Sequence, residues 1–449
     1  MTVLADCLGN PVTLQHASSL GALDDFVEGF IASEARAANI LQLAEQDHSA
    51  IVQACVAALH MFAETRDGPR NAAPYVARAV AAAATPREAR FAQAVAAWVA
   101  GDATRALALH EEQAREFPRD LASLKLAHYH LFNRGDSPGM LRLALAALPQ
   151  AADVPYLHGM LAFAWEQCHF LPQAEAAARH AIGLRRKEPW AHHALAHVML
   201  TQGRVREGID FLRSVSDTWT GLNSFMVTHN WWHLALFELE RDNHAEVLRI
   251  HDQEVWGVAK DYSQDQINAV SLLARLELAG VDVGARWQDL ADHLLAHLDD
   301  HALPFLDLQY LYGLARAGRP EAEVLKANIE RHAANAPPQI RNVWQRVCVP
   351  AAAGLLAHAR GEHERCVEQL GEALPRLVEI GGSHAQRDLF SQIHLDAMVK
   401  SSHWAGAQNL LQPLVQVHPE SLRLKRQARG LYGLLGLGDL AGPLAPTFD

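Results

Sequence analysis

An internal repeat limits the folds open to this chain of 449 residues more than any other feature of its sequence. Four similar turns recur, and the residue that follows each turn is Ala103, Ser137, Leu171 or Val205. Three positions after each of these anchors stands a residue that is small in most cases. The spacing from each anchor to the next is the same, about 34 residues, which is the period of tetratricopeptide helical hairpins. A unit of this length cannot bury its apolar face alone, so neighbouring units must stack.

Composition and punctuation indicate that the repeating unit is helical. Half of the residues are hydrophobic, alanine and leucine dominate, and the runs of valine, isoleucine and threonine typical of strands are scarce. Prolines such as Pro118 and Pro189 end the second helix of one unit and open the next. We therefore predict an all-α protein, an α-solenoid of roughly eight to ten tetratricopeptide-like hairpins wound as a right-handed superhelix.

The repeat is regular only in the middle of the chain. The next turn, Asp242–Val247, comes about five residues late, and weaker turns at Gly318, Gly361 and His403 are spaced by about 40 residues. The segment 1–85 is helical in pattern but lacks the turn signature. The predicted organisation is an N-terminal helical cap, a regular array with the candidate site, and degenerate C-terminal repeats with their own cap, covering residues 1–85, 86–250 and 251–449.

Charge and cysteine usage exclude several classes of function. The formal net charge is −12 and the isoelectric point is about 6.1, with no basic block, so nucleic acid is not an expected partner. The five cysteines form no C-x-x-C pair, which argues against a disulfide framework or a thiolate zinc site. Glycine-rich phosphate loops and dinucleotide fingerprints do not occur, so no nucleotide cofactor is expected.

Targeting signals are not visible either. The N-terminal segment lacks the basic region followed by an apolar region that a secretory signal would have. No stretch of about 18 apolar residues occurs, so membrane association is not expected. We predict a cytoplasmic protein.

Two pairs of histidines stand out against this scaffold. His193 and His197 are four residues apart, as are His229 and His233, and residues four apart share one face of a helix. The pairs fall in the first helices of successive units, which pack about 8–10 Å apart, so we expect the four imidazoles to converge on the concave face. An apolar wall and an amide accompany them: Trp190, Trp231, Trp232 and Asn230.

The sequence leaves three interpretations of these histidines open. In the first, they ligate a transition metal; the metalloprotease motif is absent, because the pairs read His-Ala-Leu-Ala-His and His-Asn-Trp-Trp-His, and we rank a metal below the second interpretation. In the second, they act without a metal as acid/base groups and ligand contacts. In the third, they are core residues, but buried imidazoles cost free energy unless hydrogen-bonded. Their clustering therefore favours a functional pocket, and no cofactor is identified.

The helix before these pairs carries two further candidates. Glu166 is an acidic residue that would orient one of the histidines, and His158 lies about one residue off the face that they share. Farther along the chain, Asp307 is a weaker candidate for contact with a ligand.

A glycine-rich segment, Gly381–Phe390, has two interpretations. It either begins a helix, with Ser383 as N-cap and Asp388 paired or solvated, or it is a loop that closes over the groove. In the second case, His384, Arg387 and Asp388 would contact polar groups of the ligand.

These segments resemble the tetratricopeptide repeat protein 38 family, whose members mostly lack an assigned activity. The resemblance covers about residues 20–435 and rests on five segments: His158–Phe163, Trp190–Val198, Gln202–Arg204, His229–Glu240 and Gly381–Asp388. It implies an all-helical repeat protein, favours a functional loop at 381–388, and groups six histidines as one site: His158, His193, His197, His229, His233 and His384. One departure is that the family carries Asp-x-His where this chain has Asp307-Leu-Gln309, which puts a shared chemistry in doubt.

We predict a small-molecule pocket near residues 158–233, closed by the segment 381–388. Acid/base chemistry such as hydrolysis or elimination would use His193, His197, His229 and His233, with Glu166 as the orienting carboxylate. Whether the protein is an enzyme stays open. The alternative is a non-catalytic scaffold that binds a peptide or protein partner, and self-association with a second copy of the chain is a third hypothesis.

Overall fold

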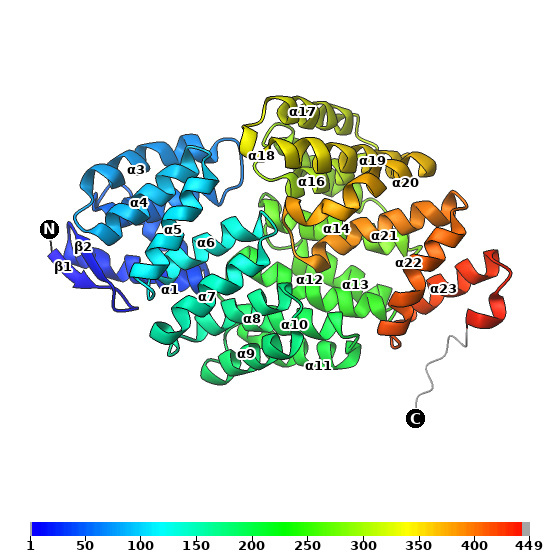
Figure 1. Cartoon of the computed structure of the whole chain (residues 1–449), viewed down its shortest axis with the longest axis horizontal. Coiled ribbons are helices and arrows are strands. Elements are labelled where there is room, and N and C mark those ends of the chain that lie inside the picture. Colours follow the sequence, from blue (N-terminus) through cyan, green and yellow to red (C-terminus); the bar gives the residue numbers. More distant parts are fainter. Residues whose placement is uncertain (1, 442–449) are drawn as a thin grey trace. The chain divides into compact units, whose positions relative to one another are not determined.

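The computed structural model describes residues 2–441, and they form α-helices labelled α1 to α23 (Figure 1). One two-stranded antiparallel sheet precedes the helices in the described part of the chain. The predicted all-α helical repeat is thereby confirmed. Within residues 2–441, no helix is both long enough and apolar enough to cross a bilayer.

The chain divides into two compact units. Unit 1 contains Met1–Leu195 and Asp217–Met226, and unit 2 contains Ala196–Ser216 and Val227–Asp449. The division falls inside two unbroken helices, α10 (Pro189–Thr201) and α12 (Ser224–Glu240). Each of these helices therefore contributes residues to both units.

Unit 1 starts with a hairpin and continues as helices. Its elements are β1 (Thr2–Ala5), β2 (Pro11–Leu14), α1 (Leu20–Ala32), α2 (Ala50–Met61), α3 (Gly68–Ala82), α4 (Pro86–Val99), α5 (Ala103–Glu116), α6 (Leu121–Phe132), α7 (Ser137–Ala151), α8 (Pro155–Gln167) and α9 (Leu171–Leu184).

The regular secondary structure of unit 2, within its described residues, consists of helices joined by turns. Its elements are α11 (Val205–Val215), α13 (His244–Ile250), α14 (Ser263–Leu278), α15 (Arg286–Leu294), α16 (Pro304–Arg316), α17 (Glu321–Asn335), α18 (Pro338–Val343), α19 (Val349–Ala359), α20 (His363–Ala373), α21 (His384–Lys400), α22 (Trp404–Val417) and α23 (Leu422–Leu434). Within this unit, α14 lies beside α21, although the two helices are far apart along the chain (Figure 1).

The sequence repeat corresponds to the second helix of each hairpin. The helices α5, α7, α9 and α11 begin at the four predicted anchors. Two of these starts have an aspartate as N-cap: the side chain of Asp102 accepts a hydrogen bond from the backbone N–H of Arg105 at 2.9 Å, and that of Asp136 from Gly139 at 2.8 Å. Such caps satisfy amides that the first helical turn leaves without partners, which explains why a Gly-Asp turn recurs in the sequence.

The helices pair in chain order. Contacts join α2/α3, α4/α5, α6/α7, α8/α9, α14/α15, α16/α17, α19/α20 and α21/α22, and α10/α11 and α12/α13 continue the same order along the chain. These ten pairs fall within the predicted range. The later, irregular turns are also confirmed, because α13, α20 and α22 begin at His244, His363 and Trp404.

The N-terminal hairpin was not predicted. Its turn is held by Asp6, whose carboxylate accepts hydrogen bonds from the backbone N–H groups of Leu8 and Asn10 at 3.0 and 2.8 Å. The backbone N–H of Thr13 donates to Glu88 Oε1 in α4 at 2.6 Å. Each strand has four residues, which is too short for a clear alternation of polar and apolar side chains.

The close approach of helices from two successive hairpins depends on a glycine. Gly208 in α11 packs against the ring of Phe237 in α12, and a Cβ atom at this position would overlap the ring atoms. Phe237 is fully buried, so the ring has little room to move.

We expect Gly208→Ala to lower the free energy of unfolding by up to about 2 kcal/mol, because the cost of overpacking the core exceeds the gain in helix propensity. Overpacking costs roughly 1–3 kcal/mol, and the change from glycine to alanine in a helix gains about 1 kcal/mol. Gly183→Ala, in α9, is the matched control, because a Cβ there meets nothing within 4 Å, and it should raise stability slightly. Urea denaturation of both variants gives the comparison; equal effects would contradict the packing argument.

Candidate metal and ligand site

The start of α10 is fixed by a buried carboxylate. Glu188 precedes the helix and accepts a hydrogen bond from the backbone N–H of Ala191, and burial raises its pKa to about 8. His192 turns away toward the chain that enters the helix: its Nε2 lies 2.9 Å from the carbonyl oxygen of Arg186, and its Nδ1 accepts from the indole N–H of Trp219 at 3.2 Å. The neighbouring histidines of α10 therefore take another face.

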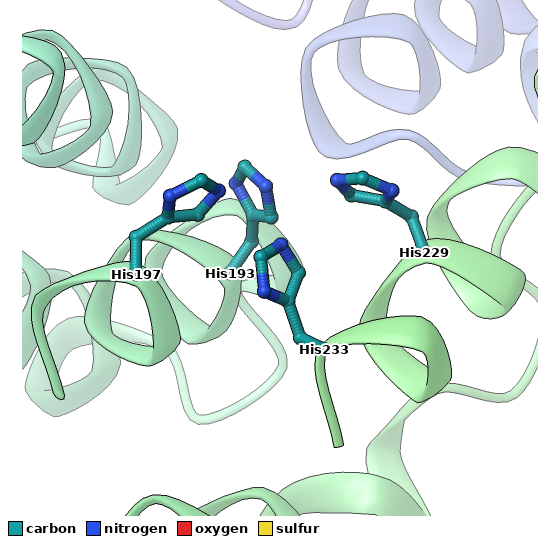
Figure 2. Close-up of side chains that lie close together, drawn as sticks. All are labelled: His193, His197, His229 and His233. Atoms are coloured by element: carbon teal, nitrogen blue, oxygen red, sulfur yellow. The ribbon is translucent and has the colours of Figure 1, made fainter. Parts of the chain in front are cut away.

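Four histidines of α10 and α12 form the histidine cluster: His193, His197, His229 and His233. Each offers one ring nitrogen, and these four atoms all lie within 4.8 Å of one another (Figure 2). The ring centroid of His233 is 4.4 Å from that of His197 and 4.9 Å from that of His229. All four side chains are buried, with at most 2% of their surface exposed. His193 and His197 belong to one continuous helix, α10, so their side chains leave the helix on the same face, one turn apart.

A chain of hydrogen bonds sets the tautomer of His229. Thr228 in α12 donates its single hydroxyl proton to Asp265 at 2.6 Å, so the same oxygen can only accept from the side-chain amide of Asn268 at 3.3 Å. The amide oxygen of Asn268 then faces Nδ1 of His229 at 3.1 Å and requires a proton there. The lone pair of His229 is consequently on Nε2.

Burial keeps this imidazole neutral. It lowers the pKa of His229 to about 3, and the hydrogen bond to Asn268 offsets only part of that effect. A neutral imidazole is the form that binds metal ions and the form that accepts a proton. In Figure 2 one ring nitrogen of His229 points toward the other three rings.

Trp232 covers one side of the cluster. Its ring is stacked on His229, with centroids 5.1 Å apart and planes within 8°, and its indole N–H donates to the Ser271 hydroxyl at 3.2 Å. The guanidinium carbon of Arg275 lies 5.5 Å from the centroid of the Trp232 ring. Since Trp232 is fully buried, it separates the cluster from water on this side.

Sequence reasoning missed the contribution of α14. Asn268, Ser271 and Arg275 follow one another at intervals of three and four residues, which places them on one face of the helix. They lie in a segment that is buried from Asp265 to Leu276. Polar residues at helical spacing within a buried helix are the signal that could have identified them.

The segment around residue 384 begins a helix, as the first of the two interpretations predicted. Ser383 is the N-cap of α21 and forms a capping box with Gln386. His384 follows, half-buried, with its Nε2 3.3 Å from the Thr201 hydroxyl at the end of α10. Its ring centroid is 5.2 Å from that of His197, so His384 adjoins the histidine cluster.

His384 also lines a cavity of about 280 Å³ in unit 2, which we name the polar cavity. Two arginines, two carboxylates, two histidines and several aliphatic side chains surround it. The lining residues are Leu200, Thr201, Val205, Leu236, Leu239, Glu240, Arg275, His384, Ala385, Asp388, Gln392, Leu414, His418, Arg423 and Leu424.

The charges of the polar cavity are partly neutralised. Arg423 and Glu240 form an ion pair at 2.7 Å, and Glu240 also accepts a hydrogen bond from the Ser421 hydroxyl. Asp388 accepts from the side-chain amide of Gln392. Burial lowers the pKa of His418.

The two candidates of α8 differ in their surroundings: His158 has local partners, whereas Glu166 offers a carboxylate oxygen within 4.8 Å of one ring nitrogen each of His197 and His384. Nε2 of His158 is 2.8 Å from the carbonyl oxygen of Ala152, and its ring stands edge-on to His180 with centroids 4.4 Å apart. Glu166 is buried and accepts a hydrogen bond from the side chain of Gln167 at 2.7 Å. Their proposed roles in binding and catalysis remain predictions.

The aromatic and amide candidates differ in burial. Trp190 is half-buried, donates its indole N–H to the Ser33 hydroxyl at 2.9 Å, and carries the Lys125 ammonium 3.3 Å from its ring centroid. Trp231 is also half-buried. Asn230 is fully buried, and neither polar atom of its side chain has a hydrogen-bond partner among the described residues.

The remaining candidates, Arg387 and Asp307, engage residues of their own neighbourhood. Arg387 donates to the carbonyl oxygens of Gly381 and Gly382, and so stabilises the turn before α21. Asp307 accepts from His301 Nδ1 at 2.6 Å, and burial raises its pKa to about 6. Neither lines the polar cavity.

No protein-family model matches the chain. Among solved structures, one described as "Structure of Naa15/Naa10 bound to HypK-THB" matches with 10% sequence identity and a TM-score of 0.25, covering 95% of this chain and 67% of that one. A likeness of this degree supports no inference about function. The tetratricopeptide-like helical repeat rests on the helices themselves, and membership of the tetratricopeptide repeat protein 38 family stays a prediction.

Proposed function

We propose that this helical repeat protein binds one divalent transition metal of the zinc class at the histidine cluster. The observation that carries the proposal is the convergence of four buried imidazole nitrogens within 4.8 Å. A tetrahedral site with metal–nitrogen distances of about 2.0–2.1 Å places its ligands about 3.4 Å apart. Small side-chain rotations on α10 and α12 would bring the four nitrogens to that separation.

The surroundings of the cluster support a metal more than a packing role. The helices carry fully buried aliphatic residues beside the histidines, such as Ala196 and Ala235, and four adjacent imidazoles in such a core are costly to desolvate. A metal ion would offset that free energy. The hydrogen bond from His229 Nδ1 to Asn268 is also the outer contact that metal-bound histidines usually make.

The polar cavity, which His384 lines, could hold a substrate close to the histidine cluster. We propose that a small molecule bound there undergoes acid/base chemistry, hydrolysis or elimination, with His384 as the proton donor or acceptor between cavity and cluster. A zinc-class ion held by three of the four imidazoles would keep one open position, at which it would polarise a water or the substrate. The aliphatic side chains of the cavity and Trp232 would exclude bulk water.

Metal analysis of the untagged protein tests this proposal. Mass spectrometry should find near one zinc-class ion per chain, or the protein stripped with chelator should take up one cobalt(II) with the visible absorption of a tetrahedral site. Failure of the stripped, folded protein to bind zinc or cobalt with a Kd below about 10 µM would overturn it.

Asn268→Ala should weaken metal binding by about 10- to 100-fold, because the hydrogen bond that orients His229 is lost. Competition titration against a chromophoric chelator measures the change. The control is Asn328→Ala in α17, where the amide donates to the backbone carbonyl of Leu298 in the same unit. Equal zinc affinities in the two variants would show that Asn268 does not orient a ligand.

A second candidate function, self-association, is favoured by the outer face of α22. Leu410, Leu414 and Val417 recur at intervals of four and three residues and are 48%, 42% and 56% exposed. An exposed apolar stripe of this spacing is typical of a helix that packs against another helix. We propose a second copy of the chain as its partner.

Light scattering during size-exclusion chromatography tests this second candidate. A dimer that becomes a monomer in Leu410→Glu, Val417→Glu protein would support it. A monomeric wild-type protein at about 100 µM would contradict it.

A further inference from the structure

The polar cavity contains a buried cation that the proposed metal site does not use. Arg275 comes from α14 and its side chain is 4% exposed. Its nearest ion-pair partner is Asp388 at 4.0 Å, and the side chain of Asp388 is 46% exposed. Arg423 in the same cavity differs, because Glu240 contacts it at 2.7 Å. One of the two guanidinium groups is therefore neutralised at contact and the other is not.

The guanidinium of Arg275 still has hydrogen-bonding capacity. Its Nη1 donates to the hydroxyl and the carbonyl oxygen of Ser271, and its Nη2 donates to the carbonyl oxygen of Ala385 at 2.9 Å. A guanidinium carries five N–H donors, so these bonds leave two for a ligand. Burial lowers the pKa of Arg275 to about 10, which leaves it protonated at neutral pH. A buried cation without a close counter-ion is unfavourable, and an anionic ligand would relieve that cost.

The rest of the lining favours an anion with a single charge and an apolar body. Arg423 and Glu240 neutralise each other, so Arg275 is the one cation of the described lining without a close counter-ion, and Asp388 would repel the second charge of a dianion such as phosphate. The aliphatic lining includes Leu200, Leu236 and Leu239, which would contact a hydrocarbon chain or ring. A volume of about 280 Å³ accommodates a molecule of roughly ten to fifteen non-hydrogen atoms.

We propose that the polar cavity binds a small monocarboxylate with an apolar tail, and that its carboxylate pairs with Arg275. Because Arg275 contacts Ala385, the residue after His384, the bound carboxylate would lie near the imidazole that adjoins the histidine cluster. The inference deepens the proposed function by naming the class of ligand. It concerns binding alone, so it can be tested without the metal.

Isothermal titration with three probes of equal length tests the ligand class. Hexanoate should bind to both zinc-loaded and chelator-stripped protein with a Kd below about 1 mM, whereas hexan-1-ol and hexylamine should bind at least ten-fold more weakly. Hexanoate binding no tighter than hexan-1-ol binding would overturn the proposal. Stripped protein that binds hexanoate but not zinc would refute the metal site and leave the carboxylate site standing.

Two variants locate the site. Arg275→Gln should weaken hexanoate at least ten-fold and leave metal content unchanged, and Arg316→Gln is the control, because Arg316 pairs with Glu277 at 2.8 Å and does not line the cavity. Should Arg275→Gln fail to fold, Leu414→Trp gives a second test, since Leu414 lines the cavity from a partly exposed position and a larger side chain would block the tail. Unchanged hexanoate affinity in folded Arg275→Gln or in Leu414→Trp protein would overturn the assignment.

Discussion

Replacing His233 by alanine is expected to weaken zinc binding by at least about 100-fold, more than the loss of an outer contact such as that of Asn268. His233 is the central ring of the cluster, because it lies next to both His197 and His229. Its loss would leave three ligands and a gap that water must fill. Zinc should also raise the melting temperature of the wild-type protein and not that of the variant, since a ligand stabilises the folded state to an extent that grows with its affinity.

The matched control for this experiment is His192→Ala. His192 is as buried as His233 and lies on α10, but its two nitrogens face Arg186 and Trp219. We expect this variant to lose stability and to keep its zinc. If both variants lose zinc to the same extent, the effect follows from damage to the helices and the cluster is not a metal site.

Acidification from pH 6.5 to 5.5 is expected to lower the free energy of unfolding by at least about 2 kcal/mol, because the pKa values of several buried groups differ between the folded and unfolded chain. Burial lowers the pKa values of His110 and His128 to about 3 and lowers that of His130 as well. Cations beside two of them, Lys125 and Arg134, act in the same direction. Near pH 6.5 the unfolded chain therefore binds protons on these histidines, whereas the folded chain does not. The free energy of unfolding that these histidines contribute above that pH is lost as the pH falls.

Two buried carboxyl groups, Glu188 and Asp307, oppose this effect, because burial raises the pKa of each. Burial raises the pKa of Glu188 to about 8 from the ordinary 4.5. As the pH falls, this carboxyl group is therefore protonated in the folded chain before it is protonated in the unfolded chain. The contribution of Glu188 to stability consequently rises as the pH falls from 8 to 4.5. Each histidine contributes about 1 kcal/mol over the pH unit and Glu188 offsets roughly one of the three.

Urea denaturation of chelator-treated protein at both pH values provides the measurement. In His130→Phe, where a phenyl ring can keep the edge-on contact with Trp98, the fall should be about 1 kcal/mol smaller. The same fall in the variant and the wild-type protein would show that His130 is not among the groups responsible.

The regular part of the fold could be predicted because local chemistry repeats there. Gly101-Asp102 and Gly135-Asp136 mark helix starts that recur with the tetratricopeptide period, and a turn of this kind is determined by residues close together in the chain. The period loosens where the helices depart from α geometry, since α13 continues as a π-helix over His251–Val255. The N-terminal hairpin depends on contacts with α4 that lie far away in the sequence, such as Thr13 to Glu88.

The same distinction applies to the site. The pairing of His193 with His197 and of His229 with His233 follows from helix geometry alone, so the sequence indicates it. The contacts made by Asn268 and Arg275 depend on how α14 packs against α12 and α21, and no local pattern specifies that packing. Arg387 is a candidate because of its closeness in sequence to His384; its guanidinium donates to the turn before α21, and its contact with a ligand stays a prediction.

The two compact units are interleaved along the polypeptide. The chain passes from one unit to the other after Leu195, after Ser216 and after Met226. A fragment that stops at residue 195 would lack the part of unit 1 that returns at 217–226, and a fragment that starts at 227 would lack the first helices of unit 2. Neither unit is one contiguous stretch of the chain, so a single protease nick cannot release either of them intact.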